Sequence, residues 1–227
     1  MNPIRVLIAD DHAIVRESIQ AVLKPESDIV VCAVAEDGRC AVRLTAQHKP
    51  QVVLMDIAMP GLNGVEATRQ ILRDNSAAKV IILSAHGEQA YVLRAIKAGA
   101  LGYLLKHASG EFLARAIREV SKGNAYFSPN VAKEIAACSL DFIGGRPGAS
   151  SLAALSAREC EVMQLIAEGR LTKQIADELG VSAKTVEKHR QRLMSKLDIH
   201  NIAGLTRYAV LNGVVEHGRI PAHEAAT

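Results

Sequence analysis

The run VLIADD, at residues 6–11, is the stretch that decides the fold class. It is a short apolar segment that ends in two carboxylates, and similar apolar segments recur up to residue 105 with helical patterns between them. The expected strands are Ile4–Ala9, Ile29–Ala35, Val52–Met55, Val80–Leu83 and Leu101–Leu105. The expected helices lie near His12–Leu23, Arg39–Gln47, Gly64–Arg73, Glu88–Ala98 and Gly110–Lys122. This alternation predicts an α/β domain with a parallel sheet and helices on both faces.

The size and number of these strand–helix units fit a flavodoxin-like α/β fold, whose five-stranded parallel sheet has the order 2-1-3-4-5. We expect this domain to span residues 1–122. Beyond Gly123 the alternation stops, and residues 123–151 read as a linker with one helix near 128–138, beginning at Ser128. The Gly-, Pro- and Ser-rich stretch Gly144–Ser151 lies within this linker.

Helical patterns alone fill the C-terminal part, so we expect an all-α domain over residues 152–217 and a tail over residues 218–227. The expected helices are Ser156–Glu168, Thr172–Leu179, Ser182–Leu197 and Ile202–Leu211. Ser156 and Glu159 form a capping-box pattern at the start of the first of these helices. We expect Thr172 and Ser182 to cap the second and third, and Gly169 and Gly180 to end the first and second.

Composition and charge are those of an ordinary globular protein. Hydrophobic residues make up 49% of the chain and the formal net charge is +3, which alone does not indicate a nucleic-acid partner. No apolar run reaches the length of a membrane span, and no signal peptide is evident. The four cysteines form no C-x-x-C pair, so we read them as reduced thiols. We therefore expect a cytoplasmic protein with no membrane partner.

Polar groups follow four of the five expected strands. Asp10 and Asp11 follow the first, Asp56 the third, Ser84 the fourth and Lys106 the fifth. In an open parallel sheet, ligands bind beyond the carboxyl ends of the strands. Carboxylates this close repel one another unless a cation intervenes, and Mg²⁺ suits such a site where phosphate is also bound. The hydroxyl and the ammonium could cradle a phosphoryl group, with Asp56 as its nucleophile.

A simpler reading assigns each of these residues to helix capping, and Asp11 and Ser84 both precede helices. We favour a shared site because all five groups fall on one edge of the sheet. Three enzyme or cofactor classes fit poorly. The sequence has no Gly-rich phosphate loop, no Gly-x-Ser-x-Gly elbow, and few aromatic residues at the strand ends for flavin stacking.

Three segments of this half resemble a response-regulator receiver domain: residues 6–12, residues 53–64 and residues 102–106. The resemblance implies that a sensor histidine kinase transfers a phosphoryl group to Asp56. It implies that the Mg²⁺ ligands are Asp10 (directly or through water), Asp11, Asp56 and the backbone carbonyl of Ala58. It further implies that Ser84 and Tyr103 form a switch pair and that Lys106 contacts the phosphate.

The C-terminal half has the layout of a helix-turn-helix: a short helix, a turn at Gly180 and a longer helix. The longer helix has a net charge of +4 over residues 184–196, whereas residues 150–227 hold ten Lys and Arg against nine Asp and Glu. Positive charge is thus concentrated on one element, as a DNA-binding helix requires. A solvated basic helix without a partner is the plainer alternative.

Residues 155–159, 173–176 and 181–189 resemble a LuxR-type DNA-binding domain, and together with the receiver they indicate a response regulator of the NarL/FixJ class. The usual motif has Asn where Leu171-Thr172-Lys173 begins the second helix. The resemblance implies base contacts by Glu187, Lys188 and Gln191. It implies phosphate contacts by Lys173, Thr185, Arg192 and Lys196.

We therefore expect a transcription factor, not an enzyme, that is controlled by phosphorylation of Asp56. The expected partners are a histidine kinase, the major groove of double-stranded DNA, RNA polymerase, and a second copy of the chain when it is phosphorylated or DNA-bound. The rival class is a signalling adaptor whose helical domain binds protein. DNA binding should weaken steeply with added salt, which separates the two.

Overall fold

The computed structural model describes residues 2–85, 89–128, 131–132 and 155–215. The chain divides into two compact units, residues 1–146 and 147–227, each described here by itself. The helix expected near 128–138 lies largely outside the described residues, and the Gly144–Ser151 stretch and the tail from residue 218 lie wholly outside them. Within the described part, no helix has the length and apolar character needed to cross a bilayer.

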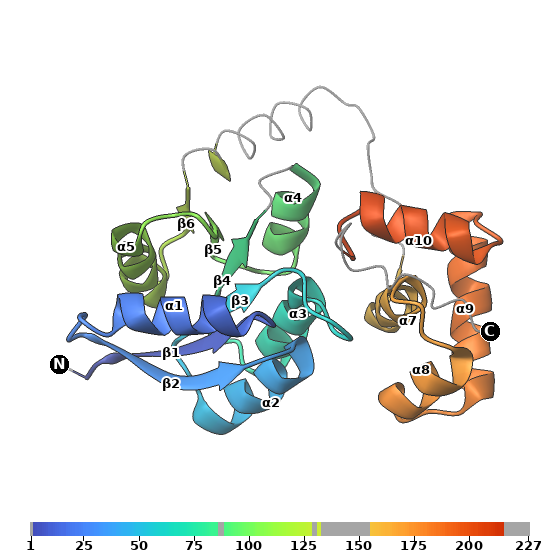
Figure 1. Cartoon of the computed structure of the whole chain (residues 1–227), viewed down its shortest axis with the longest axis horizontal. Helices are drawn as coiled ribbons and strands as arrows, with labels where there is room; N and C mark the ends of the chain where they lie inside the picture. Colours follow the sequence, from blue (N-terminus) through green and yellow to red (C-terminus); the bar gives the residue numbers. More distant parts are fainter. Residues whose placement is uncertain (1, 86–88, 129–130, 133–154, 216–227) are drawn as a thin grey trace. The chain divides into compact units, whose positions relative to one another are not determined.

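The N-terminal unit is a parallel sheet of order β2-β1-β3-β4-β5-β6 (Figure 1). The strands are β1 Ile4–Ala9, β2 Ile29–Ala35, β3 Val52–Asp56, β4 Lys79–Ser84, β5 Gly102–Leu105 and β6 Tyr126–Phe127. The first five follow the predicted order. The sixth was not predicted, because two residues are too few for a periodic pattern; β6 pairs with β5, where Gly102 lies opposite Tyr126.

Helices cover both faces of this sheet, as predicted (Figure 1). They are α1 Ala13–Leu23, α2 Gly38–His48, α3 Gly64–Asp74, α4 Gln89–Lys97 and α5 Gly110–Ser121. Residues of α1 and α5 pack with Val6, Ile8 and Leu54 in one core cluster. Residues of α2, α3 and α4 pack with Leu7 and Val53 in the other. Alternate residues of β1 and β3 thus face opposite cores, which is why the central part of each of these strands is apolar on both faces.

The C-terminal unit is helical, with α7 Ala157–Ala167, α8 Thr172–Leu179, α9 Ala183–Leu197 and α10 Ile202–Leu211. Its core contains Leu165, Ile175, Val186, Leu193 and Leu205, which are all buried. Each of the four helices thus contributes to a shared apolar centre. The described buried residues of this core include no aromatic side chain, and the partly buried Tyr208 packs against it.

Caps fix the ends of these helices largely where the sequence placed them. Ser156 and Glu159 form the predicted capping box. The Ser182 hydroxyl accepts from the Thr185 N–H at 3.1 Å. Gly169 and Gly180 adopt positive φ angles of 80° and 62°, which glycine tolerates without strain.

The prediction that Thr172 caps α8 was wrong. Leu171 is the N-cap residue, and its backbone N–H donates to the Gln174 side chain at 2.9 Å. Thr172 is instead the first residue of the helix, and its hydroxyl bonds to Glu187 of α9. A cap judged by residue type alone cannot distinguish the N-cap from the residue that follows it.

Candidate phosphoacceptor site and DNA-binding helix

Three carboxylates meet at the carboxyl ends of β1 and β3. These strands are neighbours, with Ala9 opposite Met55, so the residues that follow them lie close together. Asp10 and Asp56 are buried, whereas Asp11 is partly exposed. Ligand atoms of Asp10, Asp11, His12 and Asp56 all lie within 4.8 Å of one another. The structure thus brings the predicted acidic cluster together.

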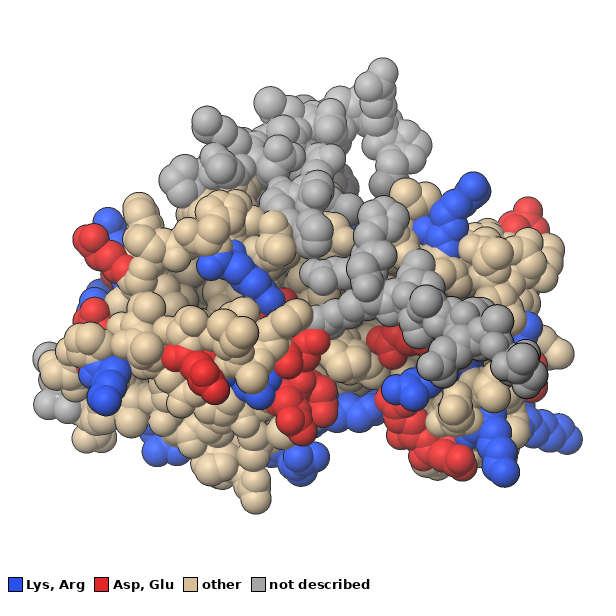
Figure 2. Space-filling view, in the orientation of Figure 1, with Lys and Arg blue, Asp and Glu red and all other residues tan. Residues whose placement is uncertain are grey.

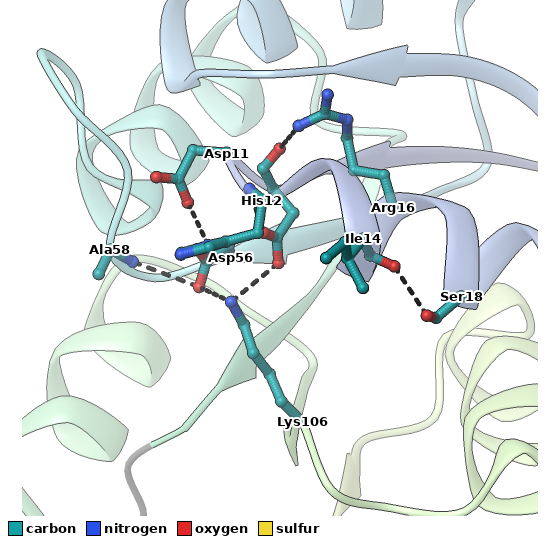
Figure 3. A network of polar contacts seen from close by, with 9 residues as sticks. Asp11, His12, Ile14, Arg16, Ser18, Asp56, Ala58 and Lys106 are labelled. Atoms are coloured by element: carbon teal, nitrogen blue, oxygen red, sulfur yellow. Dashed lines mark hydrogen bonds and ion pairs between the residues drawn. The ribbon is translucent and has the colours of Figure 1, made fainter.

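His12 is a member of this cluster that the sequence analysis did not select. Its Nδ1 lies 2.9 Å from Asp11 Oδ1 and 3.4 Å from Asp10 Oδ1 (Figure 3). The side chain is 57% exposed, so it forms the outer edge of the site. Its position directly after two strand-end carboxylates was the signal that could have identified it.

Lys106, at the end of β5, points into the cluster, as Figure 3 shows. Its Nζ lies 2.8 Å from Asp10 Oδ2 and 3.0 Å from Asp56 Oδ1. One ammonium thus balances part of the negative charge of two buried carboxylates. Lys106 thus lies next to Asp56 in the folded chain.

The electrostatic environment of Asp56 disfavours its charge. Burial, followed by the charge of Asp10, raises the pKa of Asp56 to about 7, although Lys106 opposes this rise. Burial also disfavours the Lys106 ammonium, but the carboxylates of Asp56 and Asp10 outweigh that effect and raise the pKa of Lys106. The acidic pocket therefore holds more negative charge than one lysine compensates.

A divalent cation fits this pocket. Asp56 Oδ2 is buried and has no hydrogen-bond partner among the described residues, which is costly for a carboxylate oxygen. Carboxylate oxygens are the ligands that Mg²⁺ prefers. The Ala58 backbone nitrogen lies 3.5 Å from Asp56 Oδ1, so the backbone of residue 58 is beside the Asp56 carboxylate.

The loop between β3 and α3 is held tightly against Asp56. The Asn63 side chain caps α3 by accepting from the Glu66 N–H at 3.0 Å. The Gly64 N–H donates to the Ile57 carbonyl at 3.0 Å. A Cβ at position 64 would overlap the Asp56 carbonyl oxygen, so glycine is required there for steric reasons. The Asn-Gly pair thus fixes the backbone next to Asp56.

Ser84 and Tyr103 lie on the neighbouring strands β4 and β5. Both side chains are buried. Ser84 ends β4 opposite Leu105 of β5, and its carbonyl accepts from the Lys106 N–H at 2.8 Å. The backbone therefore connects the predicted switch hydroxyl directly to the predicted phosphate-contacting lysine.

In the C-terminal unit, α9 presents a polar and mostly basic surface. Val186 and Leu193 are buried against the core, whereas Lys188, Gln191 and Arg192 are exposed. Lys173 on α8 is also exposed. Figure 2 shows basic and acidic side chains interspersed on the face of this unit that it draws. The positive charge of the C-terminal unit is thus concentrated on α9.

Three predicted DNA-contacting residues have side-chain partners within the protein: Lys196, Glu187 and Thr185, whose hydroxyl lies 2.8 Å from the Ser182 hydroxyl. Lys196 Nζ lies 2.7 Å from Oε2 of the buried Glu159. Although burial disfavours its charge, hydrogen bonds from Lys196 and Ser156 lower the pKa of Glu159. Glu187 accepts a hydrogen bond from Thr172 at 2.9 Å. Lys196 therefore has a structural role, joining α9 to the start of α7, that the sequence did not indicate.

Comparisons with known proteins agree on both units. A model of the response regulator receiver domain matches residues 6–118, and one of the luxR family of bacterial regulatory proteins matches residues 153–209. The chain is 38% identical to the response regulator UvrY of Escherichia coli strain K12 over 211 residues, which cover 93% of this chain and 95% of UvrY. It is 40% identical to the transcriptional regulatory protein LiaR of Bacillus subtilis strain 168 over 212 residues, 93% of this chain and 99% of LiaR.

The structure of the chain is also similar to a solved structure of a response regulator. RcsB from Salmonella enterica serovar Typhimurium, bound to promoter rprA in the presence of the phosphomimetic BeF₃⁻, matches with a TM-score of 0.61 and 25% identity. The match covers 91% of this chain and 98% of that chain. The chain therefore belongs to the two-component response regulators of the NarL/FixJ class, transcriptional regulators in which a receiver domain precedes a LuxR-type DNA-binding domain.

Proposed function

We propose that Asp56 accepts a phosphoryl group from a sensor histidine kinase and that this modification controls the binding of α9 to the major groove of DNA. The observation that supports this most is the buried Asp56 carboxylate, 3.0 Å from Lys106 and clustered with two further aspartates. In this proposal the receiver spans residues 1–122, the DNA-binding domain 152–217 and the tail 218–227. Residues 123–151 form the linker, whose first part supplies β6 to the sheet of the receiver.

The chemistry assigned to this site is phosphoryl transfer. Asp56 attacks phosphorus, the P–N bond of the kinase phosphohistidine breaks, and the imidazole leaves. The Lys106 ammonium stabilises charge on the phosphoryl oxygens. Asp10, Asp11, Asp56 and the Ala58 carbonyl would hold Mg²⁺, which supplies further positive charge when bound. The chain acts only on its own Asp56, so we assign it no enzymatic turnover.

We propose that Ser84 and Tyr103 couple phosphorylation to the rest of the receiver. Phosphoryl oxygens need donors, and we propose that the Ser84 hydroxyl, at the end of β4, moves toward them. Tyr103, which is already buried, would then repack into the space that Ser84 leaves. Ser84→Ala should still accept a phosphoryl group, but phosphorylation should raise its DNA affinity much less than that of the wild type. Titration of labelled DNA with each phosphorylated protein measures this. An undiminished response of the variant would show that Ser84 is not part of the coupling.

We propose base contacts by Glu187, Lys188 and Gln191, and phosphate contacts by Lys173, Thr185, Arg192 and Lys196. RcsB bound to a promoter is the relative that supports DNA as the partner. We also place the chain in the cytoplasm and expect RNA polymerase as a further partner. The adaptor alternative would show protein binding in place of salt-sensitive DNA binding.

Lys188→Ala and Arg192→Ala should weaken DNA binding in different ways. Lys188→Ala should cost about 1–3 kcal/mol on the preferred site and relax its base preference. Arg192→Ala should weaken binding to all sequences alike and lower the salt dependence by about one unit. Arg192 serves as the phosphate test because Lys196 also pairs with Glu159. Titrations on preferred and scrambled duplexes at several salt concentrations measure both effects, and indistinguishable variants would contradict the assignment.

We propose that two copies of the chain bind paired half-sites through α10. Ile202 and Leu211 on this helix are 50% and 69% exposed, so each leaves apolar surface available to a partner. A single recognition helix contacts too few bases for useful specificity. Leu211→Lys should therefore leave binding to a single half-site intact and abolish cooperative binding to two. Gel-shift titrations on duplexes with one and two half-sites distinguish these outcomes.

A further inference from the structure

A hydrogen bond joins the two helices of the helix-turn-helix. The Thr172 hydroxyl at the start of α8 donates to Glu187 Oε1 on α9 at 2.9 Å. Leu171 serves as the N-cap of α8, and Gln174 satisfies its backbone N–H. The Thr172 hydroxyl is therefore not used as a cap and instead orients the Glu187 carboxylate.

Glu187 is the acidic residue on an otherwise basic helix. The other charged residues of α9 are Lys184, Lys188, Arg190, Arg192 and Lys196. Next to DNA phosphates a carboxylate is repelled, so its presence on the recognition helix calls for a compensating contact. The described contacts of Glu187 end on one oxygen: Thr172 bonds to Oε1, and Arg190 Nη1 lies 3.8 Å from the same atom. The side chain remains 46% exposed, which leaves Oε2 to accept from a ligand.

We propose that Thr172 is a positioning residue that holds Glu187 so that Oε2 accepts a hydrogen bond from the N4 amino group of cytosine. In the major groove, cytosine presents this donor, and a carboxylate is a suitable acceptor for it. The same fixed charge repels the acceptor atoms of guanine and thymine at that position. A Glu side chain held in advance loses less rotational entropy on binding than a free one. This inference rests on the proposed DNA binding.

Selection from a random duplex pool with the full chain, treated with acetyl phosphate and Mg²⁺, provides the preferred site. Glu187→Ala identifies the base pair that Glu187 reads, because preference for cytosine should disappear there alone. Thr172→Val has nearly the same shape but lacks the hydroxyl, and it should reduce the discrimination at that same base pair by about tenfold. Thr172→Ser keeps the hydroxyl and should keep the preference. In the Glu187→Ala background, Thr172→Val should change nothing further.

Thr206→Val, on α10, is the matched control and should leave base preference unchanged. Thermal melting by circular dichroism shows whether each variant folds. If Thr172→Val weakened every duplex equally, or if Thr172→Ser lost the preference, Thr172 would have only a structural role and the inference would be wrong. If the full chain selected no sequence and bound no duplex in a salt-dependent manner, DNA binding itself would be the part that failed. Selective binding that Glu187→Ala leaves unchanged would overturn this inference and the base contact assigned to Glu187, but not DNA binding itself.

Discussion

Replacement of Asp56 by Asn should abolish phosphorylation of the chain by acetyl phosphate and Mg²⁺. Asn keeps the shape of the side chain but lacks the ionised oxygen that attacks phosphorus. The wild type should gain one phosphoryl group that is stable in acid and labile in base, as an acyl phosphate is. Intact-protein mass spectrometry measures this directly. Removal of Mg²⁺ by a chelator should suppress labelling of the wild type as well.

Asp74→Asn is a suitable control, since Asp74 is an exposed carboxylate paired with Arg73 on the surface of α3. This variant should be labelled like the wild type. Labelling that persists in Asp56→Asn would mean that another carboxylate is the acceptor.

The contribution of Asp56 to the stability of the receiver should fall as the pH rises from about 4 to about 7. The pKa of Asp56 is raised from 3.8 to about 7 in the folded chain, so over this interval the folded state holds a proton that the unfolded state has released. Above pH 7 both states are ionised and the penalty is complete. The difference in pKa corresponds to at most about 4 kcal/mol in the free energy of unfolding.

Asp56→Asn should therefore be nearly as stable as the wild type at pH 4.5 and more stable by a few kcal/mol at pH 8. Mg²⁺ should stabilise the wild type at pH 8 and have little effect on the variant, because it binds the folded carboxylates. Urea unfolding followed by tyrosine fluorescence suits this test, since three of the four tyrosines, Tyr91, Tyr103 and Tyr126, lie in the N-terminal unit. Equal pH slopes for the two proteins would contradict the raised pKa.

Most of the fold could be predicted because the signals were local and repeated. The strands are continuous apolar runs, and the caps at Ser156 and Ser182 have specific residue patterns. β6 could not be predicted, since its existence depends on pairing with the edge of β5. The acidic site could be predicted because strand order alone brings Asp10 beside Asp56.

The contacts that sequence reasoning missed are tertiary. Lys196 and Glu159 are separated by 37 residues, and Thr172 and Glu187 by 15. No periodic pattern links residues so far apart, and a basic residue on a recognition helix looks the same whether it pairs with a phosphate or with a buried carboxylate. The structure was needed to show that Lys196 has a protein partner and that Thr172 bonds to Glu187.

The central claim is that the phosphorylation state of Asp56 controls DNA affinity. The most direct measurement is the dissociation constant of the full chain for its selected duplex, with and without acetyl phosphate and Mg²⁺, for the wild type and for Asp56→Asn. We expect phosphorylation to tighten binding of the wild type by about 5- to 150-fold, the usual range of coupling between two sites, and to leave Asp56→Asn unchanged. Equal affinity of the wild type in both states, or an equal gain by Asp56→Asn, would contradict the account.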